Sequence, residues 1–250
     1  MRGGFCSGGL LLLLLIAPAG AAGTERADRL AFEVPPGMAP AAVAGDETFQ
    51  GGFTCRSDAG ENSAGTTACR SWISPVLPLF VFRLAWHVDS VTAERVVTGI
   101  WIGRDGASEP LQEMSGLELR MAVPIENAGF ELIDMDFDGH LDMRIVAGGT
   151  AGPNVLYRNW LWSVDEERFV DSAALDEIVS PEFDPETREI VSRWRSSAAE
   201  GGVDVYAWND GVPVIVHREV DRFDGPARCI RTFYDRIDEE LRETGTGSCG

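Results

Sequence analysis

Short, mostly apolar segments separated by polar, turn-forming residues dominate the chain from residue 51 onward. Residues 80–88 and 96–102 are rich in β-branched and aromatic side chains and are separated by turn-forming residues, a pattern typical of strands. Residues 203–208 and 212–216 flank the sequence Asn209-Asp210-Gly211. Because Asp-Gly steps tolerate the positive φ angles of a tight turn, this segment is predicted to form a β-hairpin.

Helical patterning is weak. It is confined to residues 171–179 and to part of 236–243. Further Asp-Gly steps occur at irregular intervals, so the sequence does not indicate a repeat array. The pattern predicts a single, mainly antiparallel β domain with little helix, propeller-like or sandwich-like, over residues 51–250.

The first 50 residues differ from the rest. Arg2 precedes a run of leucines, and small residues follow at 17–22, an arrangement typical of a secretory signal peptide over residues 1–22. The apolar run is shorter than the about 18 to 20 residues that a membrane span needs. We expect residues 23–50 to be a linker and the mature chain to be periplasmic or secreted, without membrane insertion. An uncleaved N-terminal anchor is the alternative.

Composition narrows the possible partners. The chain has 44% hydrophobic and 24% charged residues, which favours a folded protein. Its 21 basic residues are all arginine and face 40 acidic ones, for a net charge of −19. Nucleic acids and anionic lipids are therefore poor ligands. A surface of this charge suits cations or a basic protein partner.

Four cysteines follow the predicted signal peptide: Cys55, Cys69, Cys229 and Cys249. An exported chain can keep disulfides, and four cysteines allow three pairings. Each sequence-adjacent pair brackets a short segment, so two local bridges are the favoured arrangement; crossed pairs that join the two ends of the domain are the alternative.

The clearest chemical motif spans residues 134–142. Aspartates occupy positions 1, 3, 5 and 9 of this loop, and a glycine at position 6 permits a sharp turn. Such a loop offers most of the about 6 to 8 oxygen ligands that Ca²⁺ takes. The predicted ligands are Asp134, Asp136, Asp138, the backbone carbonyl of His140, and Asp142. A solvated acidic turn is the alternative.

The motif is not an EF-hand, because position 12 is Ile145 where that motif has a bidentate Glu. Apolar residues on both flanks alternate with a period of two, from Phe130 to Leu132 and from Leu141 to Ile145. The loop is therefore predicted to join two strands. A bound ion is expected to stabilise this hairpin rather than to signal.

These residues carry a resemblance. The loop is similar to the calcium loops of FG-GAP and VCBS-type β proteins. Over residues 130–220 the chain resembles bacterial periplasmic immunity proteins that accompany peptidoglycan-hydrolase effectors of type IV secretion systems, related in fold to periplasmic lysozyme inhibitors. The matching positions are Asp138-Gly139-x-x-Asp142, Gly148-Gly149, Asn154, Tyr157, Trp160 to Trp162 and Phe169. The resemblance implies a protein that binds and inhibits a basic peptidoglycan hydrolase.

For such an inhibitor, the Gly-rich turn after the loop is the expected contact surface, with Gly149, Thr150, Asn154 and Tyr157; a plain strand connection is the alternative. An enzyme is not expected, because the three histidines are scattered and no zinc-binding or nucleophile motif accompanies them. The second functional hypothesis is a calcium-stabilised surface or adhesion-type domain with an unrelated partner.

Overall fold

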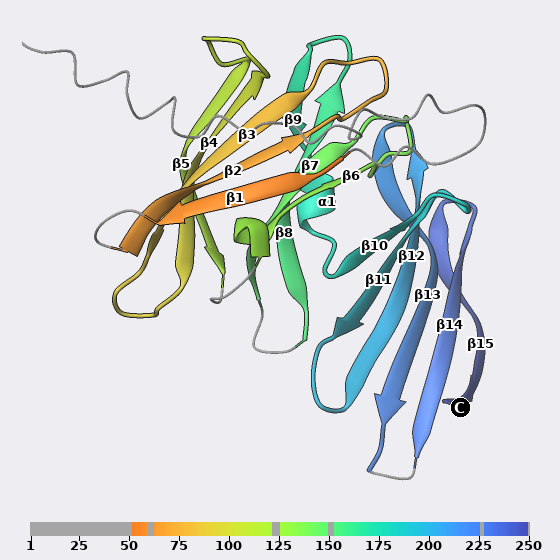
Figure 1. Ribbon diagram of the computed structural model, residues 1–250. Helices are drawn as coiled ribbons and strands as arrows, with labels where there is room; N and C mark the ends of the chain where they lie inside the picture. The colour runs from red at the N-terminus through yellow and green to blue at the C-terminus, as the bar shows by residue number, and fades with distance from the viewer. Residues whose placement is uncertain (1–51, 60–62, 122–125, 150–152, 226–227, 250) are drawn as a thin grey trace, which may run out of the picture. The chain divides into compact units, whose positions relative to one another are not determined.

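The computed structural model describes residues 52–59, 63–121, 126–149, 153–225 and 228–249 (Figure 1). Most of these residues lie in antiparallel strands that form three sheets, and each strand pairs with its neighbours in the sequence. The prediction of a mainly antiparallel β fold with little helix is confirmed. The predicted signal peptide and linker lie outside the described residues.

Sheet A has five strands in chain order. They are β1 (Thr54–Ala59), β2 (Ala64–Ser71), β3 (Phe80–Val88), β4 (Arg95–Arg104) and β5 (Gln112–Met121). The two strands predicted from β-branched and aromatic enrichment are β3 and most of β4, and they pair along their whole length.

Sheet B has four strands, again in chain order. They are β6 (Phe130–Ile133), β7 (Asp142–Gly149), β8 (Val155–Ser163) and β9 (Arg168–Asp171). A short 3-10 segment, η3 (Glu126–Gly129), precedes the sheet, and the helix α1 (Ala173–Asp176) follows it.

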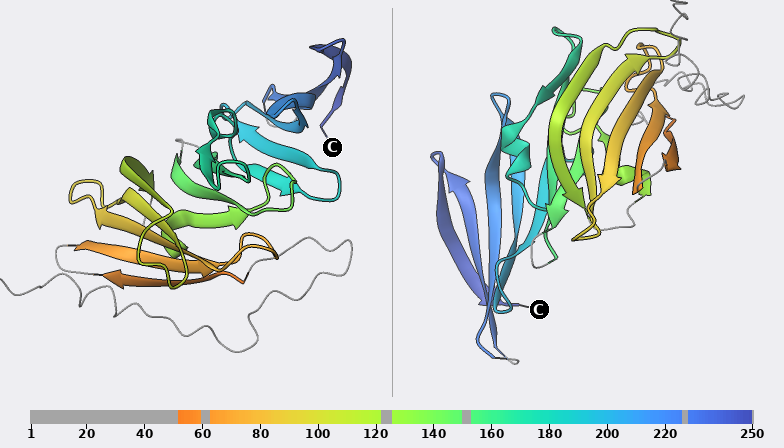
Figure 2. Two further views of the ribbon diagram at one scale, coloured as in Figure 1. Left: turned by 90° about the horizontal axis from the view of Figure 1, so that it is seen from above. Right: turned by 90° about the vertical axis from the view of Figure 1, so that its left-hand side faces the viewer.

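Sheet C has six strands, which Figure 2 shows from two further directions. They are β10 (Pro181–Asp184), β11 (Glu189–Arg195), β12 (Glu200–Asn209), β13 (Val212–Phe223), β14 (Cys229–Ile237) and β15 (Glu240–Ser248). Asp210 and Gly211 form the turn between β12 and β13 with φ angles of 49° and 77°, as a type I′ hairpin requires. The predicted hairpin is confirmed.

The helix predictions are largely wrong. Only the four residues of α1 are α-helical within 171–179, and the segment 236–243 is a β-hairpin turn instead of a helix. Asp238 and Glu239 form that turn with φ angles of 51° and 68°. The residues of this segment favour a helix by their intrinsic propensity. The pairing of β14 with β15, which includes residues 236–237 and 240–243, outweighs that propensity. No helix among the described residues is long and apolar enough to cross a membrane.

Sheets A and B share one aromatic core. Phe82 of β3 is fully buried, and its ring lies 5.0 Å from that of Phe130 and 5.8 Å from that of Phe169. Trp162 packs edge-on against Phe80 at 5.4 Å and against Phe169 at 5.2 Å. Because these residues come from both sheets, the apolar faces of the two sheets are buried against each other.

A smaller core joins sheet B and α1 to sheet C. Its fully or nearly fully buried members are Met135, Leu175, Ile178 and Ile190, and Trp208 is among the partly buried residues that pack on it. Met135 belongs to the predicted calcium loop. The packing of this loop is therefore part of the contact between the two sheets.

Two side-chain amides also connect the sheets. Gln112 of β5 donates from Nε2 to the carbonyl oxygen of Phe169 at 2.8 Å and accepts the Phe169 N–H at 2.9 Å. Asn154 forms the same pair of bonds with the backbone of Arg195, at 3.0 and 2.9 Å. Each amide satisfies a backbone donor and acceptor, which would otherwise be left unpaired.

The cysteines form two local disulfides. Cys55 is bonded to Cys69 across the β1–β2 pair, and Cys229 is bonded to Cys249 at the ends of β14 and β15. The local pairing is confirmed and the crossed alternative is wrong. Two disulfides fit a protein outside the cytoplasm, where oxidising conditions let them persist.

Candidate metal-binding loop and its scaffold

The acidic loop joins β6 to β7, two paired antiparallel strands in which Phe130 lies opposite Ile145 and Ile133 opposite Asp142. The prediction that it connects two strands is confirmed. Gly139 has a φ of 91°, and no atom lies within 4 Å of the point that a Cβ would occupy. The glycine is therefore needed for its backbone conformation and not for space.

Three of the predicted ligands lie together. Carboxylate oxygens of Asp134, Asp136 and Asp138 are all within 4.8 Å of one another. Two oxygens bound to one Ca²⁺ at roughly 2.3 to 2.6 Å can be at most about 5 Å apart. The spacing of the three carboxylates is therefore compatible with one shared cation.

Backbone amides of the loop fix this arrangement. Asp134 accepts the N–H of Asp138 on one oxygen at 3.1 Å and the N–H of Gly139 on the other at 3.0 Å. Asp136 also accepts the Asp138 N–H, at 3.2 Å. These bonds fold the loop back over its first residue, so that alternate side chains point to the same side.

Asp142 lies outside this group of three. Its side chain is 1% exposed, and its two oxygens accept the N–H groups of Met135 at 2.7 Å and Trp162 at 2.8 Å. The carboxylate thus ties the start of the loop to β8. Asp142 remains a predicted ligand, and its carboxylate also holds the loop against β8 through these two hydrogen bonds.

His140 contacts the same cluster. Its N–H donates to Asp138 Oδ1 at 2.7 Å, and its ring Nδ1 lies 3.2 Å from that oxygen. The role predicted for its backbone carbonyl stays a prediction.

Crowding of the carboxylates has an electrostatic cost. Burial, together with the charges of Asp138 and Asp134, raises the pKa of Asp136 to about 6. Burial also raises the pKa of Asp134, and it raises the pKa of Asp142 well above its usual value. A divalent cation among these oxygens would relieve this cost, because an adjacent positive charge favours ionised carboxylates.

All three sheets hold the loop. Leu141 donates its N–H to the carbonyl of Ile73, between β2 and β3 of sheet A, at 2.6 Å. From sheet C, Trp208 Nε1 donates to the carbonyl of Met135 at 3.0 Å. Arg188, in the β10–β11 turn, donates to the carbonyl of Phe137 at 2.8 Å. No local sequence signal identifies these three residues, since they are far from the loop in the chain.

The four predicted partner-contact residues are not equivalent. Gly149 is exposed at the end of β7, and Thr150 lies outside the described residues. The amide of Asn154 is already bonded to Arg195. Tyr157 is half-buried beneath the Arg144 guanidinium, 4.1 Å from its ring centre. Their contact with a partner stays a prediction.

Arg144 explains the position of Tyr157. Its buried guanidinium lies between the rings of Tyr157 and Phe183, pairs with Glu131 at 2.6 Å and donates to the carbonyl of Pro181 at 3.0 Å. A buried cation with such partners connects β7 and β8 to the first strand of sheet C.

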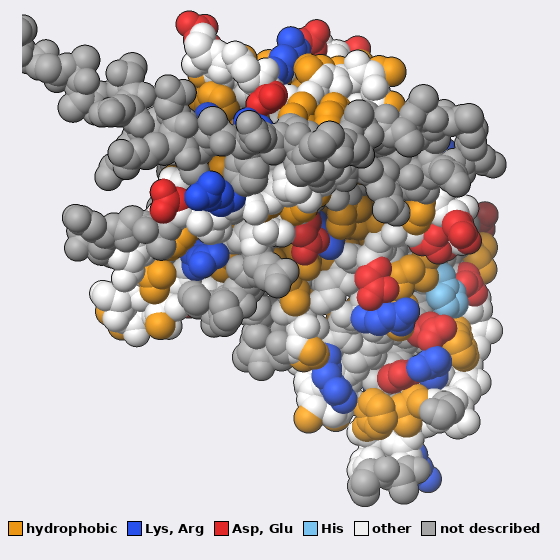
Figure 3. Space-filling view, viewed as in Figure 1, with side chains coloured by type: hydrophobic (Ala, Val, Ile, Leu, Met, Phe, Trp, Pro, Cys, Tyr) orange, Lys and Arg blue, Asp and Glu red, His pale blue; other side chains and the backbone are white. Residues whose placement is uncertain are grey.

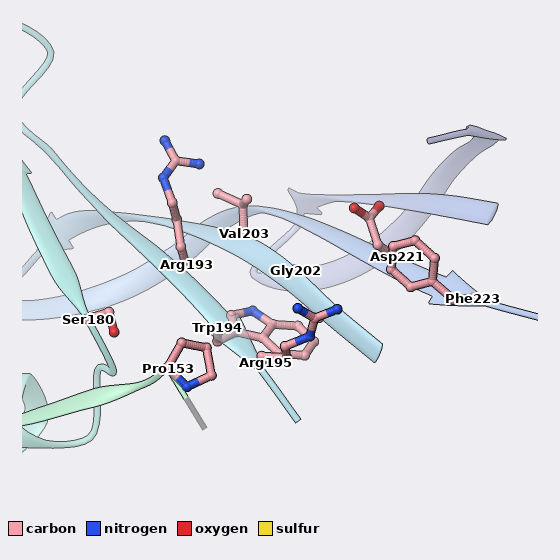
Figure 4. Close-up of a pocket in the computed structure, with 10 residues that line it drawn as sticks. Pro153, Ser180, Arg193, Trp194, Arg195, Gly202, Val203, Asp221 and Phe223 are labelled. Carbon is pink, nitrogen blue, oxygen red and sulfur yellow. The ribbon is translucent and has the colours of Figure 1, made fainter. Parts of the chain in front are cut away.

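A hollow of about 470 Å³ lies at one end of sheet C, lined in part by Pro153, Ser180 and Trp194 (Figure 4). The Trp194 ring lies over Gly202 on the neighbouring strand, where an added Cβ would come within 2.6 Å of it. Arg193 points away from that ring (Figure 4). Ser180, Arg193, Arg195 and Asp221 also line the hollow, so its walls are both polar and apolar.

Fold and loop together define a class: a mainly antiparallel, disulfide-bonded β protein with an acidic loop at the junction of its sheets. No protein-family profile and no curated protein matches the chain. Among solved structures, it is similar to a Xanthomonas type IV secretion system related protein, with a TM-score of 0.57 and 16% identity. The similarity covers 77% of this chain and 99% of that one. At this identity it shows a shared fold.

Proposed function

We propose that this chain is a calcium-binding β protein of the extracytoplasmic space that binds a basic peptidoglycan hydrolase and inhibits it. The observation that carries the proposal is the cluster of three carboxylates in a loop that all three sheets hold in place. A rigid element of this kind favours inhibition, because a pre-organised surface loses little conformational entropy on binding.

A hard cation such as Ca²⁺ fits the donor set better than a soft transition metal does. Carboxylate oxygens are hard ligands, and no cysteine or histidine ring nitrogen belongs to the group of three. Asp134, Asp136 and Asp138 would hold the ion, and the charge of the ion would offset their mutual repulsion. Met135 and Phe137 lie between the proposed ligands in the sequence. Their carbonyl oxygens accept hydrogen bonds from Trp208 and Arg188 of sheet C. A bound ion would therefore also stabilise the contact between sheets B and C.

Charge and similarity support the partner class. A net charge of −19 attracts a basic protein and accelerates its association. The structural neighbour is described as related to a type IV secretion system, in line with the sequence resemblance to immunity proteins that neutralise secreted hydrolases. The Gly-rich segment 148–154, whose first two residues end β7, is the proposed contact surface.

A cell-wall turbidity assay tests the proposal. Lysis by a panel of basic lysozyme-type hydrolases should slow when the mature protein is added in millimolar Ca²⁺. Asp136→Asn should weaken this inhibition, whereas Asp165→Asn, a change of an exposed acid in the β8–β9 turn, should leave it intact. If calcium binds but every hydrolase stays fully active and forms no complex, inhibition is wrong and a calcium-stabilised surface or adhesion-type domain remains.

A further inference from the structure

The outer edge of β15 has no partner strand among the described residues, since β15 pairs only with β14. The start of the opposite edge of sheet C is covered. Ser180, just before β10, donates its N–H to the carbonyl of Val155 at 2.8 Å, and Arg144 donates to the carbonyl of Pro181. The four-residue β10 is thus tied to sheet B, whereas β15 is the longer edge strand of sheet C.

The two halves of β15 differ in protection. Charged residues Glu240, Arg242 and Glu243 occupy the first half, and Thr244 forms a bulge there, because Phe233 pairs with Gly245 while Tyr234 pairs with Glu243. Charges and bulges are the usual devices that prevent an edge from pairing. The second half, residues 245–248, has no charge, no proline and no bulge.

Hydrogen bonding shows which backbone groups of this half face outward. Cys249 donates its N–H to the carbonyl of Cys229, directly opposite, at 3.4 Å. In an antiparallel pair the inward-bonded residues alternate with outward-facing ones. Gly247 and Gly245 therefore bond to β14, and Ser248 and Thr246 direct their N–H and C=O groups outward. The Cys229–Cys249 disulfide fixes the end of this edge.

An apolar contact lies beside the edge. The ring of Phe233 on β14 is 3.9 Å from a Cβ position at Gly245 and 3.8 Å from one at Gly247. Because both residues are glycines, no side chain of β15 covers the ring at these two positions. An added strand could place a side chain over the glycines and against Phe233, as cross-strand pairs do.

We propose that an extended segment of a basic protein partner adds to residues 245–248 as a seventh strand of sheet C. Main-chain bonds to Thr246 and Ser248 would supply affinity, and Phe233 would favour an apolar side chain. Five acids and two arginines lie between Asp235 and Ser248. A second copy of this chain would bring the same excess of negative charge, so a basic segment is the better occupant.

This inference rests on the proposed function for the identity of the partner, but strand addition can be tested separately. The probe is a synthetic peptide that alternates arginine with valine; the same peptide with proline at every second position is its control. Hydrogen exchange of the full mature chain is followed by NMR. The amides of Thr246 and Ser248 should exchange at least tenfold more slowly with the first peptide only, while those of Gly245 and Gly247 serve as internal references.

Three substitutions sharpen the test. Thr246→Pro removes an outward N–H without breaking a bond to β14, a placement that edge strands tolerate, and should weaken peptide binding at least tenfold. Thr246→Val removes the hydroxyl but keeps the backbone N–H. It therefore shows how much of the effect of the proline variant comes from the lost hydroxyl alone. Gly247→Val fits at an ordinary contact distance from Phe233. It should cover the ring and weaken binding without lowering the unfolding midpoint, and it keeps the test decisive if the proline variant does not fold.

The outcomes separate the two proposals. Slower exchange at Thr246 and Ser248 with the peptide, but no hydrolase bound, retains the edge and overturns the inhibitor. Hydrolase binding that Thr246→Pro and Gly247→Val leave unchanged, with no slowing of exchange by hydrolase or peptide, retains the inhibitor and overturns strand addition.

Discussion

The shared core of sheets A and B and the outer strands of sheet C are stabilised in different ways. In the first region, aromatic rings such as Phe80, Phe82 and Phe130 are almost completely removed from water. In β12 to β15, acidic and basic side chains alternate across the strands (Figure 3). Arg231, for example, pairs with Asp221 at 2.6 Å and with Glu219 at 2.8 Å.

The difference identifies where stability resides. Burial of a large apolar side chain contributes about 1.5 to 3 kcal/mol, whereas a solvent-exposed ion pair contributes about 0 to 1 kcal/mol. The outer strands of sheet C must therefore depend on backbone pairing, on the Cys229–Cys249 bond, on the partly buried Asp204–Arg218 pair and on contact with sheet B. The acidic loop lies at that contact.

The largest expected effect is from truncating the shared core. Phe82→Ala should lower the free energy of unfolding by about 3 to 5 kcal/mol, because it leaves a cavity among fully buried rings. Phe233→Ala, the same change on a partly exposed ring of β14, should cost no more than about 1.5 kcal/mol. Urea unfolding of both variants measures the difference. Equal losses would show that the two regions do not differ as argued.

Strand positions could be predicted where one face of a sheet is buried. Enrichment in β-branched and aromatic residues identified β3 and most of β4, and Asp210-Gly211 identified the β12–β13 turn. The same reasoning failed at residues 236–243, where helix-forming residues occupy the exposed β14–β15 turn. On an exposed strand pair, buried and exposed side chains do not alternate along the sequence. A prediction from local propensity alone is therefore misleading there.

The second prediction concerns the loop between the two regions. Saturation of the mature protein with Ca²⁺ at a hundredfold excess over Kd should raise the free energy of unfolding by about 2.7 kcal/mol. Asp138→Asn should remove most of this gain, because Asp138 is one of the three clustered carboxylates. Thermal melts in Ca²⁺ and in chelator measure it, with Asp165→Asn as the matched control. Identical midpoints for the unmodified chain would contradict a calcium site.

The third prediction compares the two amides that connect the sheets. Gln112→Leu should lower the free energy of unfolding by about 1 to 2 kcal/mol, because it leaves a part-buried N–H and carbonyl of Phe169 unpaired. Asn154→Leu breaks equivalent but exposed bonds to Arg195, and water can replace them. Its effect should be smaller. A larger loss for Asn154→Leu would mean that sheet C depends on sheet B more than burial indicates.

The candidate site could be predicted in part. Spacing of aspartates and a glycine is a local signal, and it located the three clustered carboxylates and the strand-to-strand loop. The supports could not be predicted, because Trp208, Arg188 and Ile73 reach the loop only through the tertiary fold. The backbone bonds of Asp142 were missed for the same reason, since its partner Trp162 lies on another strand.

The smallest expected effect is the part of the pH dependence that comes from the outer strands. His217 of β13 lies 2.7 Å from Asp235, and this hydrogen bond raises the pKa of the histidine above its ordinary value. A raised pKa in the folded state stabilises the fold while the histidine is charged. The contribution is complete below the unfolded pKa of about 6.5 and is lost as the pH rises through the folded pKa.

Urea midpoints measured from about pH 5.5 to about pH 9, a range that brackets the histidine pKa, check this expectation. The midpoint of the unmodified chain should fall as the pH rises, and His217→Gln should make that fall smaller because glutamine does not titrate; the carboxylates of the acidic loop, whose pKa values are also raised, account for the rest. The buried aromatic core has no titratable group among its rings, so the Phe82→Ala variant should keep the same pH dependence at a lower midpoint. If His217→Gln instead retains the full pH dependence, the ion pairs of β13 and β14 are not what distinguishes the outer strands from the core.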